Sequence, residues 1–299
     1  MTTADSRSVR SGFVALAGRP NVGKSTLVNA IVGHKVAIVS DKPQTTRRAI
    51  RGVASGADWQ LVLVDLPGVQ RPRDALTERM QRRVETEMAD ADAALVVING
   101  EEGVGPGDRF IADALGGATQ PVVLAVNKVD RLDRARTAAA LQATADLRPG
   151  ADVFPVSART GAGLGPLVEH LVGLLPEGPL YFPADARSDQ PAHVELAELV
   201  REQVLARTRQ ELPHAVEVQV DEIEEQRGLI RVRAYIWVET ESQKGIVIGA
   251  GGRMVKAIGT AARRALERRL GARVHLDLSV RVRRRWRADE DLLDRLGID

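Results

Sequence analysis

The chain has 299 residues, of which 44% are hydrophobic and 27% are charged, and it contains no cysteine. That length suits two domains of ordinary size, and the lack of cysteine excludes disulfide bonds and thiolate metal sites. Residues 1–11 lack the apolar core of a signal peptide, and no apolar run approaches the roughly 18–20 residues that span a bilayer. We therefore expect a soluble, cytoplasmic protein whose residues 1–11 are flexible.

Charge is unevenly distributed along the chain. The formal net charge is only +2, but residues 253–287 contain 12 Lys and Arg against 2 Asp and Glu, a local excess of 12 − 2 = +10. Such a segment is typical of a surface that binds nucleic acid or an anionic membrane. A solvated helix face would explain the same charge, so charge alone leaves both interpretations open.

Short apolar runs organise the first half of the chain, over residues 12–178. They consist mostly of Val, Leu, Ile and Ala without polar alternation, as strands buried on both faces of a parallel sheet do. Helical stretches separate them, which predicts an α/β fold with a doubly wound, mostly parallel sheet. The runs are Phe13–Ala17, Leu61–Val64, Leu95–Ile98, Val122–Val126 and Val153–Val156.

A phosphate-binding loop follows the first of these runs. The pattern GxxxxGK[ST] lies between a predicted strand and a predicted helix, which is the context that a P-loop requires. Its glycines let backbone N–H groups approach phosphates closely, and the helix that starts near Lys24 adds its positive end. We expect Lys24 to reach the β- and γ-phosphates. The residues of the motif are Gly18, Arg19, Pro20, Asn21, Val22, Gly23, Lys24 and Ser25, followed by Thr26.

Three further motifs follow predicted strands in the order that a GTPase requires. The carboxylate of Asp130, in an NKxD pattern, accepts both N–H donors on the guanine edge, a pair that adenine does not offer. We expect a backbone N–H of Ser157-Ala158-Arg159 to bind the guanine O6. The motifs comprise Asp65, Leu66, Pro67 and Gly68; Asn127, Lys128 and Asp130; and Ser157, Ala158 and Arg159.

The same order predicts a magnesium site and a γ-phosphate sensor. Thr45 and Thr46 lie between the P-loop and Asp65, where a switch threonine senses the γ-phosphate. We expect Ser25, Thr46 and Asp65 to hold Mg²⁺, and Lys24, Thr46 and Gly68 to contribute to catalysis. GTP, GDP and Mg²⁺ are therefore the predicted ligands.

The second half of the chain has a different composition and a different order of predicted elements. Residues 179–190 form a predicted inter-domain linker, because they hold prolines and several polar residues. The expected order beyond it is α-β-β-α-α-β, with helices over 193–210 and 253–270 and strands around 215–224, 229–239 and 273–282. A GxxG sequence falls between two helices, as in the loop of a KH domain that clamps four nucleotides. The predicted RNA-binding residues are Lys244, Gly249, Ala250, Gly251, Gly252, Arg253, Lys256, Arg263 and Arg264.

The whole chain from about Gly12 to Gly297 resembles the Era family of bacterial ribosome-assembly GTPases. GRPNVGKST, Pro43–Arg47, NKVD, SAR and the stretch Gln243–Gly249 carry the resemblance. It implies a type II KH domain over residues 191–299 that binds the 3′ region of 16S ribosomal RNA during assembly of the 30S subunit. We expect a monomer with no DNA partner. Leu66 departs from the threonine that is usual in the family, and Ala250-Gly251 departs from a pair that often includes Lys.

Two features bear on the rate of hydrolysis. Val69 follows the DxxG glycine where Ras-like enzymes place a water-orienting Gln, so we expect slow intrinsic turnover that a partner raises. In related GTPases an Asn at the position of Asn21 ligates K⁺, so K⁺ could accelerate hydrolysis here.

Two alternatives stay open: an RNA-binding assembly factor whose nucleotide site is structural, and a regulatory GTPase associated peripherally with the inner membrane.

Overall fold

The computed structural model describes residues 9–42, 44–69, 72, 74–208, 212–226 and 228–298. Residues 1–8 of the expected flexible N-terminus lie outside these ranges. The chain divides into two compact units, and each combines separate stretches of sequence. The first comprises Met1–Ala37, Thr46–Arg71 and Gln81–Asp189, and the second comprises Ile38–Thr45, Pro72–Met80 and Gln190–Asp299.

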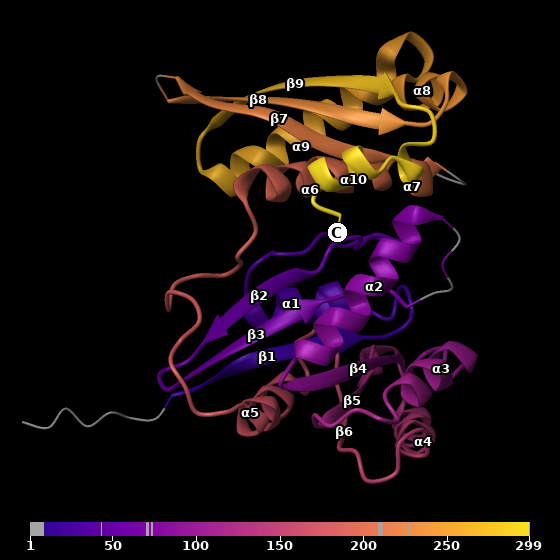
Figure 1. Cartoon of the computed structure of the whole chain (residues 1–299), viewed down its shortest axis with the longest axis vertical. Helices are drawn as coiled ribbons and strands as arrows, with labels where there is room; N and C mark the ends of the chain where they lie inside the picture. The colour runs from indigo at the N-terminus through magenta and orange to yellow at the C-terminus, as the bar shows by residue number, and fades with distance from the viewer. Residues whose placement is uncertain are drawn as a thin grey trace, which may run out of the picture. The chain divides into compact units, whose positions relative to one another are not determined.

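The first unit is built on a six-stranded sheet in the order β2-β3-β1-β4-β5-β6 (Figure 1). β1, β3, β4, β5 and β6 run parallel to one another, and β2 pairs antiparallel with β3 at one edge. The predicted doubly wound, mostly parallel sheet is confirmed. The strands are β1 (Arg10–Ala17), β2 (Ile50–Ser55), β3 (Trp59–Asp65), β4 (Ala93–Asn99), β5 (Val122–Asn127) and β6 (Val153–Pro155).

Helices cover both faces of this sheet. One core packs Leu27 of α1 and Leu167 of α5 against one face, and another packs Met88 of α2 and Ile111 of α3 against the other. Because strand residues alternate between these two cores, each apolar run is buried throughout, as the sequence predicted. The helices are α1 (Lys24–Val32), α2 (Ala75–Asp90), α3 (Pro106–Ala114), η1 (Val129–Arg131), α4 (Arg134–Ala145) and α5 (Leu164–Leu174).

Three details of this unit differ from expectation. β1 begins at Arg10, inside the stretch expected to be flexible, and β2 was not predicted. The predicted linker also packs closely: the Gln60 side chain donates to the Phe182 carbonyl at 2.9 Å and accepts from the Phe182 N–H at 2.9 Å. The Tyr181 ring meets the Phe13 ring edge-on, with centroids 4.8 Å apart. Residues 181–189 are therefore part of the first unit.

The second unit contains a three-stranded sheet in the order β7-β8-β9, covered on one face by helices (Figure 1). β7 and β8 are antiparallel, and β8 and β9 are parallel. The predicted α-β-β-α-α-β order is confirmed, with the short α7 added before β7. The elements are α6 (Ala192–Leu205), α7 (Leu212–Ala215), β7 (Glu217–Gln226), β8 (Leu229–Val238), α8 (Glu241–Ile248), η2 (Ala250–Gly252), α9 (Arg253–Leu270) and β9 (Arg273–Val282).

The core of this unit follows from the alternation along its strands. Val274 is buried, and Leu276, Leu278, Val280 and Val282 pack partly buried against the same cluster. The inward alternation predicted for β9 is confirmed. The strand turns every second residue toward the helices, and polar residues occupy the other face.

A C-terminal element was missed from the sequence. Residues beyond β9 form η3 (Trp286–Ala288) and α10 (Glu290–Arg295). Trp286 is fully buried with Leu76 and Leu293, and its indole N–H donates to the Ala215 carbonyl at 2.9 Å. Arg287 pairs with Asp74, so this part of the basic segment is structural rather than available to a partner. None of the helices in the described ranges combines the length and apolar composition that crossing a bilayer requires.

Candidate functional site

The phosphate-binding loop connects β1 to α1, as predicted. Gly23 has φ 102°, and a Cβ there would lie 2.4 Å from Asn127 Nδ2. At Gly18, a Cβ would lie 2.6 Å from the Val97 carbonyl oxygen. Both positions therefore exclude any side chain, which is the physical reason for glycine in this pattern.

Lys24 is buried at the start of α1. Its ammonium donates to the Gly18 carbonyl at 2.9 Å and to the Arg19 carbonyl at 3.3 Å. Burial lowers the pKa of Lys24 to about 8, against the opposing attraction of Asp65. A buried ammonium held by two carbonyls has capacity for a strong anionic partner.

Three oxygen-bearing side chains meet beside Lys24. Ser25 Oγ donates to Asp65 Oδ2 at 2.6 Å and lies 3.1 Å from Thr46 Oγ1, which in turn lies 3.4 Å from the same carboxylate oxygen. The other oxygen, Asp65 Oδ1, is buried and has no hydrogen-bond partner among the residues that the structure describes. Burial raises the pKa of Asp65, although Lys24 opposes this. Hydroxyl and carboxylate oxygens in such a cluster suit a hard cation such as Mg²⁺.

The two switch threonines have different hydrogen-bond partners. Thr46 lies in the cluster just described, whereas the Thr45 hydroxyl donates to the Lys42 carbonyl at 2.6 Å. The Thr45 carbonyl accepts from Arg201, a buried arginine of α6 that also pairs with Glu198. Of the two residues, only Thr46 is placed to share a cation with Ser25.

The DxxG segment leaves the end of β3 next to the P-loop. A Cβ on Gly68 would lie 2.9 Å from the Pro20 ring, so the two segments touch without a side chain between them. Leu66 is fully buried in the core beneath. Pro67 lies between Leu66 and Gly68 in the sequence.

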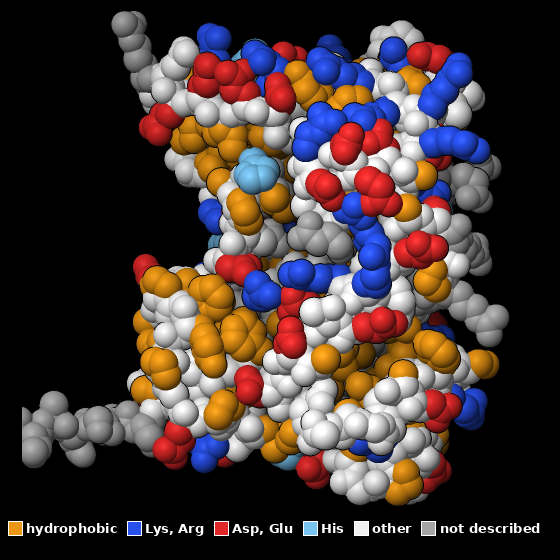
Figure 2. Space-filling model, in the orientation of Figure 1, with side chains coloured by type: hydrophobic (Ala, Val, Ile, Leu, Met, Phe, Trp, Pro, Cys, Tyr) orange, Lys and Arg blue, Asp and Glu red, His pale blue; other side chains and the backbone are white. Residues whose placement is uncertain are grey.

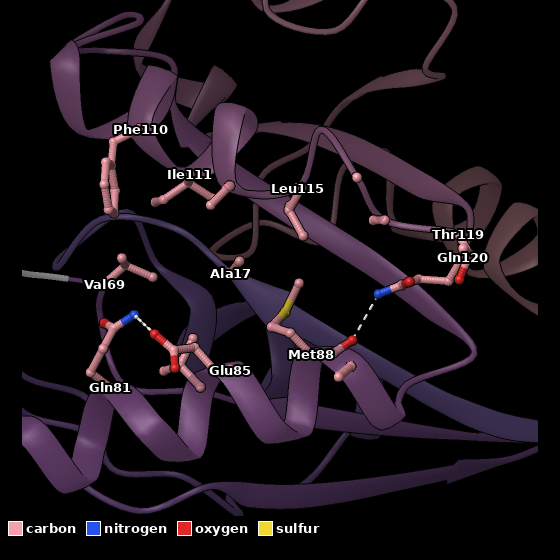
Figure 3. Close-up of a pocket in the computed structure, with 15 residues that line it drawn as sticks. Ala17, Val69, Gln81, Glu85, Met88, Phe110, Ile111, Leu115, Thr119 and Gln120 are labelled. Carbon is pink, nitrogen blue, oxygen red and sulfur yellow. Dashed lines mark hydrogen bonds between the residues drawn. The ribbon is translucent and has the colours of Figure 1, made fainter.

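Val69 faces an apolar groove rather than the phosphate loop. The groove has a volume of about 560 Å³ and lies between α2 and α3, with Met88, Phe110 and Leu115 among its lining residues (Figure 3). Phe110 is 57% exposed there. Because a valine in these surroundings offers no hydrogen bond, it cannot orient a water molecule, as the sequence predicted.

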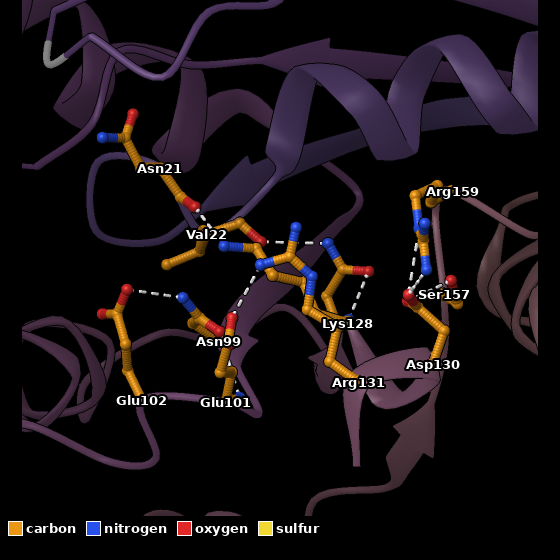
Figure 4. Close-up of polar contacts among 11 residues, drawn as sticks. Asn21, Val22, Asn99, Glu101, Glu102, Lys128, Asp130, Arg131, Ser157 and Arg159 are labelled. Carbon is orange, nitrogen blue, oxygen red and sulfur yellow. Dashed lines mark hydrogen bonds and ion pairs between the residues drawn. The ribbon is translucent and has the colours of Figure 1, made fainter.

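The base-recognition segments converge on the same edge of the sheet (Figure 4). Asn127 Nδ2 donates to the Val22 carbonyl at 2.9 Å, and the Lys128 ammonium donates to the Asn21 carbonyl at 2.8 Å. Asn127 Oδ1 accepts from the Ala158 N–H at 3.0 Å. That N–H, part of the segment expected to bind the guanine O6, is thus used within the protein. Through these hydrogen bonds, Asn127 connects its own NKxD segment to the P-loop and to the segment that contains Ala158.

Asp130 is held in place by two neighbours. Its Oδ1 accepts from Ser157 Oγ at 2.6 Å, and its Oδ2 accepts from Arg159 Nε at 3.0 Å and also from Arg159 Nη2 (Figure 4). The hydrogen bond from Ser157, followed by that from Arg159, lowers the pKa of Asp130. The carboxylate is therefore ionised and oriented, and Arg159 presents to it two parallel N–H donors, the same number that the guanine edge offers.

Asp108, which pairs with a residue of the P-loop, was missed from the sequence. Arg19 forms an ion pair with the fully buried Asp108 at 2.8 Å and with Glu102 at 3.2 Å. Asp108 lies at the start of α3, and its distance in sequence from the loop hid the pairing. Thr26 follows Ser25 in α1 and is half-buried.

The GxxG loop lies between α8 and α9 in the second unit, where the sequence predicted it. Gly249, Gly251 and Gly252 all have positive φ, of 72°, 59° and 75°. At Gly249, a Cβ would meet Met254 Cβ at 2.6 Å, whereas Gly251 has open space around it. The loop therefore exposes backbone that a ligand can approach closely.

The predicted RNA-binding side chains divide into two groups. Lys244 pairs with Glu241 at 3.8 Å, and Arg263 pairs with Glu267 at 2.9 Å, so both carry a carboxylate beside them. Arg253, Lys256 and Arg264 instead line a groove together with Arg207, which the sequence interpretation had missed. The sequence does not reveal this grouping because it arises from tertiary packing: Arg207 follows α6, whereas the other three residues lie on α9.

Comparisons with known proteins agree with both units. Residues 13–128 match the family described as 50S ribosome-binding GTPase, and residues 211–287 match the KH domain family. GTPase Era of Mycobacterium sp. (strain KMS) is 46% identical over 295 residues, which cover 96% of this chain and 98% of that protein. GTPase Era of Mycobacterium tuberculosis (strain ATCC 25177 / H37Ra) is 46% identical over 294 residues, with the same coverage. This chain belongs to the Era family.

Solved Era structures share the whole fold. Era of Aquifex aeolicus, in a variant bound to GDP and AlF₄⁻, superposes with a TM-score of 0.94 at 34% identity, covering 97% of this chain and 99% of that one. A second Era structure, a complex with MgGDPNP and nucleotides 1506–1542 of 16S ribosomal RNA, matches with the same TM-score of 0.94, identity and coverage. The Era-type chain described here is accordingly a GTP-binding, GTP-hydrolysing enzyme with a P-loop GTPase domain and a KH domain.

Proposed function

We propose that this chain is a GTP-operated switch that binds small-subunit ribosomal RNA through its KH domain and acts in assembly of the 30S subunit. One observation carries the proposal: the chain matches, over 97% of its length, an Era structure in complex with MgGDPNP and nucleotides 1506–1542 of 16S ribosomal RNA. The exposed GxxG loop supports it, because such a loop binds nucleotide backbone.

In the proposed nucleotide site, each motif has a separate task. The N–H groups of residues 18–26 and the ammonium of Lys24 bind the phosphates. Asp130 accepts the two N–H donors of guanine, while Asn127 and Lys128 hold the P-loop against the base-binding segment. The Ser157 hydroxyl holds Asp130 Oδ1, and a backbone N–H of residues 157–159 binds the guanine O6. We propose a GTPase domain over residues 12–178 and a KH domain over residues 191–299. Residues 179–190 connect them in sequence, although most of this stretch packs within the first unit.

We further propose that Ser25, Thr46 and Asp65 hold Mg²⁺. The support is the cluster of their oxygens and the buried, unpartnered Asp65 Oδ1. Mg²⁺ bound with GTP neutralises charge on the β- and γ-phosphates.

Hydrolysis in this scheme depends on position and charge rather than on a strong base. Lys24 stabilises negative charge that develops on the transferred phosphoryl group, and the Gly68 N–H contacts the γ-phosphate. Thr46 orders the switch when the γ-phosphate is present. Since Val69 cannot orient the attacking water, we expect slow turnover until a partner orders this segment.

Potassium is a separate proposal. Asn21 has φ 64° and is exposed at the mouth of the P-loop. Its side-chain oxygen would be the ligand for K⁺, whose charge would replace that of an arginine finger. The support here is the asparagine itself and its position in the loop.

Ribosomal RNA binding by the full-length protein tests the proposed function. The fragment is nucleotides 1506–1542 of 16S ribosomal RNA, with an unrelated hairpin of equal length and a DNA copy as controls. We expect selective binding of the ribosomal fragment by a monomeric protein, and enrichment on 30S precursors in cytoplasmic extracts. Equal affinity for all three nucleic acids, or association with inner-membrane vesicles alone, would count against an assembly role.

A further inference from the structure

A cationic groove lies between the C-terminal end of α6 and the outer side of α9. It has a volume of about 390 Å³, and its lining residues are Arg207, Arg253, Lys256, Ala257, Thr260, Ala261 and Arg264. Four of these seven are cations, and none is acidic or aromatic. All of them belong to the second unit.

Carboxylates do not neutralise this groove within the described ranges. Arg207 donates to the carbonyl and side-chain oxygens of Gln203, both at 3.1 Å, and Arg253 donates to the Ala250 carbonyl at 3.2 Å. These are neutral acceptors, and no ion pair in the described part of the chain involves Lys256 or Arg264. The neighbouring Arg263 and Arg269, by contrast, pair with Glu267 and Glu195. The uncompensated charge is therefore confined to one side of the helix.

The spacing of the groove residues makes a continuous track. Arg253, Lys256, Thr260 and Arg264 follow one another at three- and four-residue steps, so they form one stripe about 16 Å long. Ala257 and Ala261 leave room for a ligand to approach the helix closely. The opposite side of α9, with Ile258 and Leu266, is buried against the sheet.

We propose that this groove binds the sugar–phosphate backbone of RNA that has left the GxxG loop, as a second, sequence-independent contact. The inference rests on the proposed RNA-binding function and extends it. Arg253 directly follows Gly252, so the stripe begins at the loop and continues away from it along α9. Guanidinium groups bind phosphate oxygens in pairs, and the lining offers no aromatic ring on which a base could stack. Figure 2 shows Lys and Arg side chains gathered over the second unit on the face in view.

The salt dependence of RNA binding tests the groove directly. Each lost phosphate contact reduces the slope of log K against log salt concentration by about 0.7 to 0.9, which corresponds to about four- to fivefold weaker binding at 0.15 M salt. We expect this change for Arg207→Ala and for Arg264→Ala in the full-length protein with nucleotides 1506–1542 of 16S ribosomal RNA. The loss should be the same for an RNA of altered base sequence.

Arg231→Ala is the matched control. It removes the same charge from an exposed position on β8, on the sheet face opposite the helices, and should leave the slope unchanged. Gly251→Asp, which adds an anion to the GxxG loop, should weaken binding far more than either groove variant.

Unchanged slopes for both groove variants, with wild-type binding intact, would overturn the proposed groove and leave the RNA-binding function standing. Failure of the wild-type protein to bind the fragment would remove that function itself. Binding to phosphatidylglycerol vesicles is the remaining measurement. Vesicle binding that requires Arg207 and Arg264, without an effect on RNA binding, would assign the groove to lipid headgroups and overturn the proposal.

Discussion

Replacing Asp130 by Asn tests the base-recognition geometry with a change of one atom. The native carboxylate accepts from Ser157 on Oδ1 and from Arg159 on Oδ2, so its plane and ionised state are fixed before guanine arrives. Guanine presents two N–H donors, and a carboxylate accepts both. An amide has one oxygen and one N–H₂ group, so one donor of the base loses its acceptor and faces another donor.

The expected loss can be worked out from these contacts. One hydrogen bond to a charged group contributes about 1.5–3 kcal/mol, and changing the second from charged to neutral costs about 1 kcal/mol more. The exposed pair between Asp130 and Arg159 is worth at most about 1 kcal/mol, and guanine no longer has to displace it. The net loss is about 3 kcal/mol, which is roughly a 150-fold increase in Kd.

Competition against a fluorescent GDP analogue measures this loss. GDP should bind Asp130→Asn roughly two orders of magnitude more weakly, while xanthosine diphosphate, which has a carbonyl in place of the guanine amino group, should bind better than it does to wild type. Arg159→Ala is the control for the ion pair and should change the Kd of GDP no more than about fivefold. A loss below tenfold in Asp130→Asn, with no gain for the xanthine nucleotide, would refute the assigned role of this carboxylate.

Three other predictions concern different parts of the chain. Because burial lowers the pKa of Lys24 to about 8, the ammonium that binds phosphate is fully present only well below pH 8 and is largely lost by pH 9. Calorimetric titration should therefore show GDP affinity falling by up to about tenfold between pH 7 and pH 9. Hydrolysis should be faster in K⁺ than in Na⁺ buffer, and Asn21→Ala should abolish the difference; equal wild-type rates would exclude K⁺. Trp286→Ala should lower the free energy of unfolding by about 3–5 kcal/mol in denaturant titrations, whereas Trp286→Phe should lose about 1–3 kcal/mol by leaving the Ala215 carbonyl unpaired.

Local signals explain why so much of the fold was predictable. In the first unit, the predicted strands are unbroken apolar runs. Each of the four nucleotide-binding motifs there follows directly from one of these runs. β9 and α9 matched their predicted bounds because alternation and basic periodicity mark them along their full length. β2 was missed because Arg51, Gly52 and Ser55 interrupt its apolar pattern, and its place is set by pairing with β3.

Long-range contacts explain what the sequence did not reveal. Nothing local distinguishes Thr45 from Thr46; the difference arises from their partners Lys42 and Asp65. The basic run after β9 gave no sign of Trp286 packing against residues that precede it by more than two hundred positions. Arg207 likewise becomes part of a groove only after α6 and α9 pack together.

Lys24 and Asp65 place opposite charges side by side in a buried part of the nucleotide site. Burial moves the pKa of Lys24 down and that of Asp65 up, so each group is driven toward its neutral form although the two attract one another. Their attraction therefore does not compensate for the loss of water, a situation known for buried ion pairs. A phosphate beside Lys24 and a cation beside Asp65 would reverse both shifts, and a ligand that binds only the folded state adds about 2.7 kcal/mol of stability at 100 times its Kd. The same burial that shifts both pKa values thus makes nucleotide binding and folding of this domain mutually dependent.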